Sequence, residues 1–505
     1  MASGPGVYLA GRAGTRLAAR GDGDLDQPSR RHQPQRFGAR AHRHVGLLAG
    51  SEVLVIDARE TGEKAGLRDG RLATAPTCAA TSIIRAPGQP SQKSRLMLKE
   101  TADARPTRRY VEKREAILDA AARLFNRKGL RGATLSDVAQ EVGLSTNSIT
   151  YYYRKKEDLV VACLMRTIDE IASIADATAG DPLPQARVRR FIALFFQRLA
   201  RTATGERPEL MSFREIRSLP DTHADVAFAA YTDMFRRIRK VLRSDTPKDP
   251  AQRSALSAAA HLLLSLTSGA MTWVERYEPE DYPKVADTVV DILLNGFASP
   301  SSRWDSAPAA TPPISKAETT QEAFLRAATE LLNELGYRGA SADRISARLN
   351  LTKGAFYHHN ENKDDLISAC FDRMFAVIRD AQSKVEDGPG TGWDKLCAIA
   401  RALVSYQFSS QGPLLRLTIY GALPEEMRKE KILTMNRLSA RFARFLVQGM
   451  QDGSIRALDQ SIASLQVNGM INAAVELRRW VPDASGENAA DLFIRPLFLG
   501  IFSGQ

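Results

Sequence analysis

The stretch GLRGATLSDVAQEVGLSTNSITYYY, residues 129–153, decides the fold of this chain. Thr134 is placed to cap a short helix, and Asp137, three residues later, favours the positive end of that helix. Gly143 permits a sharp turn, and Ser145 is placed to cap the helix that follows. We therefore predict two short helices joined by a tight turn, with an inward face made of Val138, Ala139 and Val142.

The same pattern returns later in the chain. Residues 112–166 are repeated without a gap at residues 319–373, so that Gly129 recurs as Gly336, a shift of 207 positions (336 minus 129). At the turn of the copy Asn350 replaces glycine, and asparagine also accepts positive φ. A constant shift over so long a segment means that one folded unit has been copied.

The second short helix of each copy carries small polar and aromatic side chains. Such a surface is suited to the major groove of DNA, where hydroxyl and amide groups contact base edges or phosphates. A purely structural role for the tyrosines is the alternative. In the first copy this surface consists of Thr146, Asn147, Ser148, Thr150, Tyr151 and Tyr152, whereas Tyr153 is expected to pack inward.

The whole arrangement resembles the tetracycline-repressor (TetR) family of bacterial transcription regulators. The shared features are an amphipathic first helix ending in glycine, an aromatic-rich recognition helix, and a Lys-acidic-x-Leu entry to the fourth helix. That entry reads Lys156-Glu157-Asp158-Leu159 in the first copy and Lys363-Asp364-Asp365-Leu366 in the second. The resemblance implies a sequence-specific DNA-binding transcriptional regulator and no enzyme. It more often implies a repressor, which a small-molecule effector would release from DNA.

The resemblance also implies which residues contact DNA. The recognition helices 145–152 and 352–359 would enter the groove, and the two entry lysines would lie near backbone phosphates. In the first copy the expected contacts are Thr134, Ser145, Thr146, Asn147, Ser148, Thr150, Tyr151, Tyr152 and Lys156. In the second they are Ser341, Thr352, Lys353, Gly354, Ala355, Tyr357, His358, His359 and Lys363.

The two copies differ from the family pattern and from each other. Thr150 stands where the family usually has Tyr, Asn147 where Gly is common, and Asn360 where an aromatic residue closes the helix. Residues 105–160 carry a net charge of +5, whereas residues 316–366 carry −1. Because phosphate neutralisation dominates affinity, we expect the first copy to bind DNA more strongly. Whether the second copy binds DNA or has become an interaction module stays open.

The rest of the sequence excludes several kinds of site. The His358-His359 pair points in directions about 100° apart on a helix and has no partner at metal-ligand spacing, so no metal is expected. The four cysteines stand far apart, which argues against disulfides. We find no phosphate loop and no catalytic constellation, and we expect no cofactor. With no span-length apolar run and no secretory signal, a cytoplasmic, nucleoid-associated protein is expected.

We predict an all-α chain with two tandem units. The net charge is +12, of which residues 1–96 supply +7. We expect residues 1–100 to be a disordered basic tail, with Met97 as the possible true start of translation. The expected divisions are a DNA-binding domain at 111–171, a helical body at 172–299, a linker at 300–316, a second DNA-binding domain at 318–378 and a second body at 379–505. Within the bodies the patterns predict helices at 187–202, 222–243, 250–276, 284–298, 393–410, 424–451, 459–480 and 488–503.

Such proteins bind DNA as two-fold symmetric dimers, and the two halves of this chain could form such a dimer in two ways. Residues 250–298 would pack on residues 459–503 within one chain, giving an intrachain pseudo-dimer that reads a pseudo-palindromic operator. A homodimer with four reading heads and a palindromic operator is the competitor. An effector would bind in one or both bodies, but its identity and its binding residues cannot be read from the sequence. The candidate pocket residues are equally compatible with core packing: Phe191, Phe195, Phe196, Met211, Phe213, Met271, Trp273, Phe408, Tyr420 and Trp480.

Overall fold

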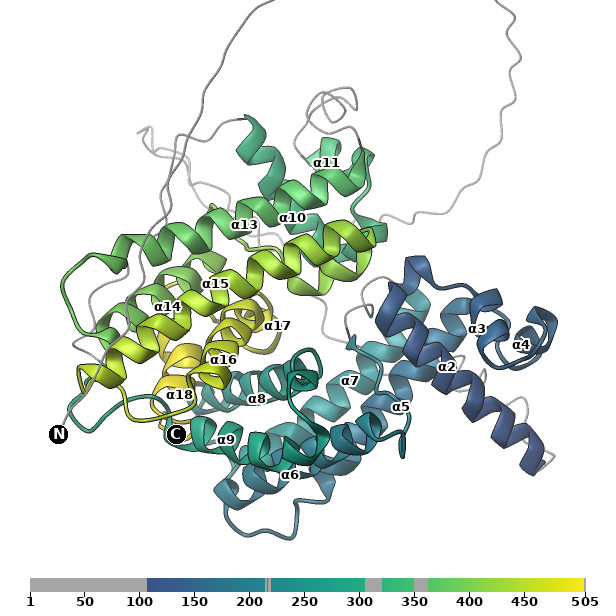
Figure 1. Cartoon of the computed structure of the whole chain (residues 1–505), viewed down its shortest axis with the longest axis horizontal. Helices are drawn as coiled ribbons and strands as arrows, with labels where there is room; N and C mark the ends of the chain where they lie inside the picture. The colour runs from purple at the N-terminus through teal and green to yellow at the C-terminus, as the bar shows by residue number, and fades with distance from the viewer. Residues whose placement is uncertain (1–106, 214–215, 217–218, 305–319, 349–361, 504–505) are drawn as a thin grey trace, which may run out of the picture. The chain divides into compact units, whose positions relative to one another are not determined.

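The computed structural model is all-α in the part of the chain that it describes, which is residues 107–213, 216, 219–304, 320–348 and 362–503 (Figure 1). The predicted all-α class is thereby confirmed. Within those ranges the β-type pairing consists of one isolated antiparallel bridge, between Ala298 and Ile455. The predicted basic tail and the predicted recognition helix of the second copy lie outside the described residues.

The first copy folds into three helices, which we call the first head. They are α2 (Arg108–Gly132), α3 (Leu135–Glu141) and α4 (Thr146–Tyr152). Helix α2 begins three residues before the predicted domain boundary at residue 111, because the hydroxyl of Thr107 accepts a hydrogen bond from the amide of Tyr110. The predicted end of its regular winding is confirmed, since Gly129 has φ of +66°. The hydrophobic core of the head includes Ile117, Phe125, Val138 and Ile149, and residues of α5 (Lys156–Asp176) and α7 (Asp221–Leu242) complete it.

Long helices continue the first half. They are α5 (Lys156–Asp176), α6 (Pro184–Ala203), α7 (Asp221–Leu242), α8 (Pro250–Ala270) and α9 (Tyr282–Asn295), with a 3₁₀ turn at Val274–Arg276. The single helix predicted over 250–276 is therefore wrong in one respect, since α8 ends at Ala270. Trp273 leaves helical geometry, with φ of −136° and ψ of −13°, and its ring is buried beside that of Phe196.

The second half repeats this plan. It contains α10 (Thr320–Gly339), α11 (Ala342–Arg348), α13 (Lys363–Glu386), α14 (Gly392–Phe408), α15 (Glu425–Gln451), α16 (Gln460–Ala473), α17 (Leu477–Trp480) and α18 (Arg495–Phe498). We call the repeated unit that begins with α10 and α11 the second head. The helix predicted at 459–480 is divided by a 3₁₀ turn at Ala474–Glu476. The helix predicted at 488–503 begins with a π-helical turn at Ala490–Ile494 and ends earlier than predicted, at Phe498.

The two halves share a continuous hydrophobic core. Helices α8 and α9 lie against α16, α17 and α18, which are the segments predicted to pair. The imidazole of His261 bonds to the carbonyl of Ala473 at 2.9 Å, and the amide of Ile501 donates to the carbonyl of Leu293 at 2.7 Å. This core extends into the second head, including Phe324, whereas the core of the first head forms a separate cluster.

The predicted linker is only partly a linker. Its first residues, up to Trp304, pack against the second half instead of spanning a gap. The indole of Trp304 is 7% exposed, donates to Asp491 at 2.6 Å, and lies under the guanidinium of Arg401. Burial of this large aromatic ring explains why the proline-rich composition was misleading at residues 300–304. The remainder of the segment, up to residue 319, lies outside the described residues.

The cysteines of the two copies occupy equivalent buried positions. The thiol of Cys163 faces the carbonyl of Leu118, and that of Cys370 faces the carbonyl of Leu325. Burial raises the pKa of each of these thiols to about 12. Both are free thiols and pack as small apolar residues of the core. None of the helices in the described part of the chain combines the length and the apolar character that a bilayer span requires.

Candidate nucleic-acid interface

A reciprocal cap fixes the start of α3. The hydroxyl of Thr134 accepts a hydrogen bond from the amide of Asp137 at 3.1 Å, and the Asp137 carboxylate accepts one from the amide of Thr134 at 2.7 Å. The hydroxyl and the amide of Thr134 both donate to this carboxylate, and these two hydrogen bonds lower the pKa of Asp137. The exposed Thr134 side chain is thus already engaged within the head, at the place where the sequence predicted a DNA contact.

The turn between α3 and α4 depends on a left-handed glycine. Gly143 has φ of +65°, and a side chain there would meet no neighbouring atom within 4 Å. The turn closes with a hydrogen bond from the amide of Leu144 to the carbonyl of Ala139 at 2.8 Å. Glycine is therefore needed for backbone conformation and not for space.

Helix α4 is anchored on one side and exposed on the other. Ile149 is fully buried, and the amide of Ser148 donates to the hydroxyl of Ser145, which caps the helix. The hydroxyls of Ser145 and Ser148 lie 2.9 Å apart, and that of Thr150 donates to the carbonyl of Asn147. Three of the predicted contacts are thus engaged locally, while the exposed residues on this helix are Thr146, Asn147 and Tyr151.

A cluster of tyrosine rings joins α4 to the start of α2. The Tyr110 ring lies 4.8 Å from that of Tyr152 and 6.3 Å from that of Tyr151. Tyr151 is 76% exposed, whereas Tyr153 packs inward as predicted, and burial raises the pKa of Tyr153 to about 12. The contact with Tyr110 was not predicted, because nothing in the local pattern links residues so far apart.

The entry lysines have internal partners. The ammonium of Lys156 donates to the carbonyls of Leu130 at 2.6 Å and Ala133 at 3.1 Å, where the last turn of α2 ends. The ammonium of Lys363 likewise donates to the carbonyl of Tyr337 and lies 4.0 Å from the centre of that ring. A cation at a helix C-terminus interacts favourably with the helix dipole. Both lysines therefore hold the head together, a role that the resemblance did not imply.

Part of the positive charge of the first head is also paired. Glu141 lies 2.9 Å from Arg123 and 3.5 Å from Arg127, and Asp137 lies 3.3 Å from Lys128. These pairs are partly exposed, so water and salt screen them and each contributes little to stability. They lower the positive electrostatic potential that a phosphate backbone would meet on this side of the head.

The described part of the second head follows the same plan. The hydroxyl of Ser341, the counterpart of Thr134, accepts from the amide of Arg344 at 3.3 Å, and Ile345 is fully buried. Asn362 caps α13 through the amides of Asp364 and Asp365. The predicted contacts Thr352, Lys353, Gly354, Ala355, Tyr357, His358 and His359 lie outside the described residues.

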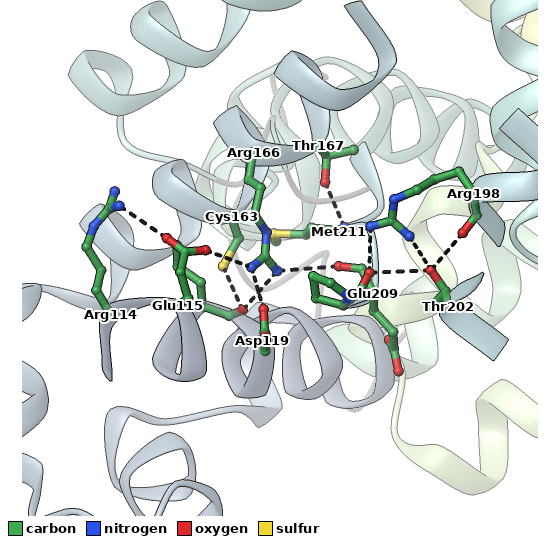
Figure 2. A network of polar contacts seen from close by, with 12 residues as sticks. Arg114, Glu115, Asp119, Cys163, Arg166, Thr167, Arg198, Thr202, Glu209 and Met211 are labelled. Carbon is green, nitrogen blue, oxygen red and sulfur yellow. Dashed lines mark hydrogen bonds and ion pairs between the residues drawn. The ribbon is translucent and has the colours of Figure 1, made fainter. Parts of the chain in front are cut away.

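An arginine on α5 ties the first head to the body (Figure 2). The guanidinium of Arg166 pairs with Asp119 and lies 3.6 Å from Glu115, both on α2. It also donates to the backbone carbonyls of Leu118 at 3.4 Å and Glu209 at 3.5 Å. The same side chain thus joins the first helix of the head to the segment that precedes α7.

The second half contains an equivalent arginine. Arg373 stands 207 positions after Arg166 (373 minus 166); it pairs with Glu322 on α10 and donates to the carbonyl of Pro413 at 3.4 Å. Asn126 and Asn333 add matching bonds, to the carbonyls of Leu210 and Leu414. Sequence reasoning missed these four residues, although the constant shift of 207 positions could have singled them out.

Comparison with known proteins places these features in a family. The profile described as "Bacterial regulatory proteins, tetR family" matches residues 117–163 and 324–370, which are themselves 207 positions apart (324 minus 117). The profile "Tetracyclin repressor-like, C-terminal domain" matches residues 389–483.

Individual relatives match parts of the chain. The Transposon Tn10 TetC protein of Escherichia coli is 27% identical over 152 residues, which cover 30% of this chain and 76% of that protein. The HTH-type transcriptional regulator RutR of Escherichia coli (strain K12) is 32% identical over 88 residues, 17% of this chain and 42% of that protein. The crystal structure of AibR in complex with isovaleryl coenzyme A and operator DNA aligns with 25% identity and a TM-score of 0.31, covering 35% of this chain and 97% of that chain.

The capped helix, left-handed turn and exposed second helix define a helix-turn-helix DNA-binding protein. Two segments of the tetR family of bacterial regulatory proteins stand in tandem in this chain, and a tetracycline repressor-like C-terminal domain follows the second of them. Members of the family to which it is similar are transcription regulators and not enzymes.

Proposed function

We propose that this regulator is a repressor that binds an operator through its helix-turn-helix heads and is released by a small-molecule effector. The observation that carries the proposal is α4, which buries Ile149 and exposes Thr146, Asn147 and Tyr151 on one short helix. An amide, a hydroxyl and a phenol on a rigid helix are groups that contact base edges and phosphates. The division into DNA-binding domains at 111–171 and 318–378, with bodies at 172–299 and 379–505, belongs to this proposal.

The pairing of the two halves supports an intrachain pseudo-dimer. Apolar residues of α8 and α9 share one core with those of α16 and α18, and Arg456 bonds to Asp291 at 2.7 Å across the two halves. Such a pair presents two unlike heads to DNA, so the operator would be an imperfect palindrome. Light scattering on the pure protein tests this. A single-chain mass, with and without operator, supports the pseudo-dimer, whereas twice that mass supports the homodimer.

The recognition helix of the first head is tested by Asn147→Ala in an operator shift assay. Loss of one base contact costs about 1–3 kcal/mol, which is on the order of ten-fold or more in affinity. Binding to unrelated DNA should change little, because phosphate contacts are retained. Gln460→Ala, which removes an exposed amide from α16, is the matched control. Equal operator affinity for both variants contradicts the assigned role of α4.

The second candidate function is a sensor or adaptor in which only the first head binds DNA. The net charge of −1 over residues 316–366 favours this reading, since a phosphate-binding surface needs positive charge. Lys353→Glu places a repulsive charge on the predicted recognition helix of the second head. A marked loss of operator affinity supports two DNA-binding heads. Unchanged affinity, together with an unchanged operator footprint, supports the adaptor.

A further inference from the structure

A cavity of about 410 Å³ is lined by residues of both halves. From the first half it takes Ser212, Phe213 and Ile216, and from the second half Arg416, Leu417 and Tyr420, each 204 positions later (416 minus 212). Its wall continues on α7 with Tyr231 and on α15 with Met435, again 204 positions apart. Equivalent positions of the two halves therefore surround one shared space.

This shift of 204 positions is structural and not accidental. Helices α7 and α15 both follow a capping proline, Pro220 and Pro424, at the same separation. In both halves the segment that precedes this helix is bonded to an asparagine of the head. The backbone amide of Ser212 donates to the side chain of Asn126, and that of Arg416 donates to the side chain of Asn333, each at 3.0 Å. The repeat thus continues into the bodies with three positions fewer than in the heads.

The chemistry of the wall favours an amphipathic organic anion. The aromatic rings of Phe213, Tyr231 and Trp273 supply apolar surface. Among the described residues of the wall, the charged groups are three arginines and one carboxylate, and Arg416 pairs with that carboxylate, Glu476, at 2.6 Å. Arg276 and Arg479, one from each half, supply two exposed guanidinium groups to the wall. Arg276 bonds to Asn436 at 3.0 Å, and Arg479 lies 4.1 Å from the centre of the Phe228 ring.

Two buried polar atoms on the wall also point to a ligand. The side-chain oxygens of Gln466 and Ser268 are buried, and neither has a hydrogen-bond partner in the described structure. Gln466 is only 1% exposed and lies on the second half, while Ser268 lies on the first. Buried polar groups in folded proteins are normally satisfied, so a ligand with hydrogen-bonding groups would complete both.

From this geometry we propose that the chain has one effector site, shared by its two halves, which takes a single amphipathic organic anion per chain. The inference rests on the proposed function in that it names the class of effector and its site. The site also has a direct connection to DNA binding. The segments 209–213 and 413–417 form part of its wall and bond to Asn126, Arg166, Asn333 and Arg373, which anchor them to the two heads.

The test uses 1-anilinonaphthalene-8-sulfonate, an amphipathic organic anion whose emission rises in apolar surroundings, titrated into the full chain. The shared site predicts one molecule bound per chain. Arg276→Gln in the first half and Arg479→Gln in the second should each weaken binding of that one molecule by about five-fold or more. Both side chains are exposed, so the fold should be retained, and circular dichroism checks this.

Matched controls are available on α8 and α15, two helices that line the cavity. Arg253→Gln on α8 and Arg437→Gln on α15 remove exposed arginines that do not line the cavity, and they should leave binding unchanged. Two molecules bound per chain, with each cavity variant removing one of them, would overturn the shared site. Binding that is insensitive to both cavity arginines would also overturn it, as would the absence of binding.

Operator retention separates this inference from the proposed function. One molecule bound per chain, sensitive to both arginines, supports the shared site even if the protein retains no DNA, in which case only the proposed function fails. If the operator is bound but two molecules of the probe bind independently, the proposed function stands and the shared site fails.

Discussion

Replacement of Lys156 by Met distinguishes an internal role for this lysine from the phosphate contact that the family resemblance implies. The substitution keeps most of the side-chain stem and removes the ammonium, which donates to the carbonyls of Leu130 and Ala133. A hydrogen bond from a charged group contributes about 1.5–3 kcal/mol, and Lys156 is half-buried. We therefore expect the first head to lose about 2 kcal/mol of stability, which is about thirty-fold in its opening equilibrium.

Hydrogen exchange followed by mass spectrometry measures this loss of stability separately for each segment of the chain. Because the core cluster of the first head is separate from the one that contains α16, amides of α2 and α3 should exchange about thirty-fold faster in the variant, while those of α16 should not change. Lys155→Met, the exposed neighbour, is the matched control and should leave exchange unaltered.

The salt dependence of operator binding supplies the decisive comparison. Each phosphate contact contributes about 0.9 to the slope of log K against log salt concentration. Loss of an internal lysine should leave that slope unchanged for the folded protein. If the variant's slope is shallower by about 0.9 and its hydrogen exchange is unaltered, the internal role is refuted and Lys156 is a phosphate ligand.

Three further predictions concern the head and the core. Gly143→Ala should cost about 1–2 kcal/mol in urea unfolding because φ is +65°, and Gly143→Asn should cost less, since the copy has Asn350 there; equal costs would contradict the conformational argument. Thr134→Ala should lower the free energy of unfolding by about 1 kcal/mol. Because Thr134 lowers the pKa of Asp137 in the folded state, this difference between wild type and variant should be present at neutral pH and should disappear as the pH falls below about 4 in thermal melts. Burial lowers the pKa of His261, so the unfolded chain binds its proton first, and stability should fall as pH drops below about 6.5, an acid loss that His261→Gln should reduce in the same melts.

The heads were predictable because their structure is determined by neighbours in sequence. Thr134, Gly143 and Ser145 act within four residues, and the structure places a cap, a left-handed turn and a second cap at these positions. The direction of the Lys156 side chain was not predictable, because it depends on where the end of α2 lies relative to α5. Sequence spacing alone carries no such information.

The features that join head to body depend on contacts across long distances in the chain. Arg166 acts through the carbonyl of Glu209, 43 residues away, and a backbone carbonyl leaves no trace in residue identity. The cavity was equally hidden, since Phe213 and Tyr420 have the same apolar character as core residues. What distinguishes the cavity residues is a shift of 204 positions, as between Phe213 and Leu417, which differs from the 207 of the heads and becomes recognisable only in three dimensions.

The contact of α8 and α9 with α16 and α18 occurs inside one polypeptide, and this has a consequence for dosage. Subunits that must meet before they bind DNA respond to the square of their concentration, and they separate on dilution. A tether replaces that encounter with a fixed effective concentration, in the millimolar range for short connections. If the internal pair is sufficient for operator binding, occupancy would rise in simple proportion to the number of chains in the cell, even when only a few copies are present.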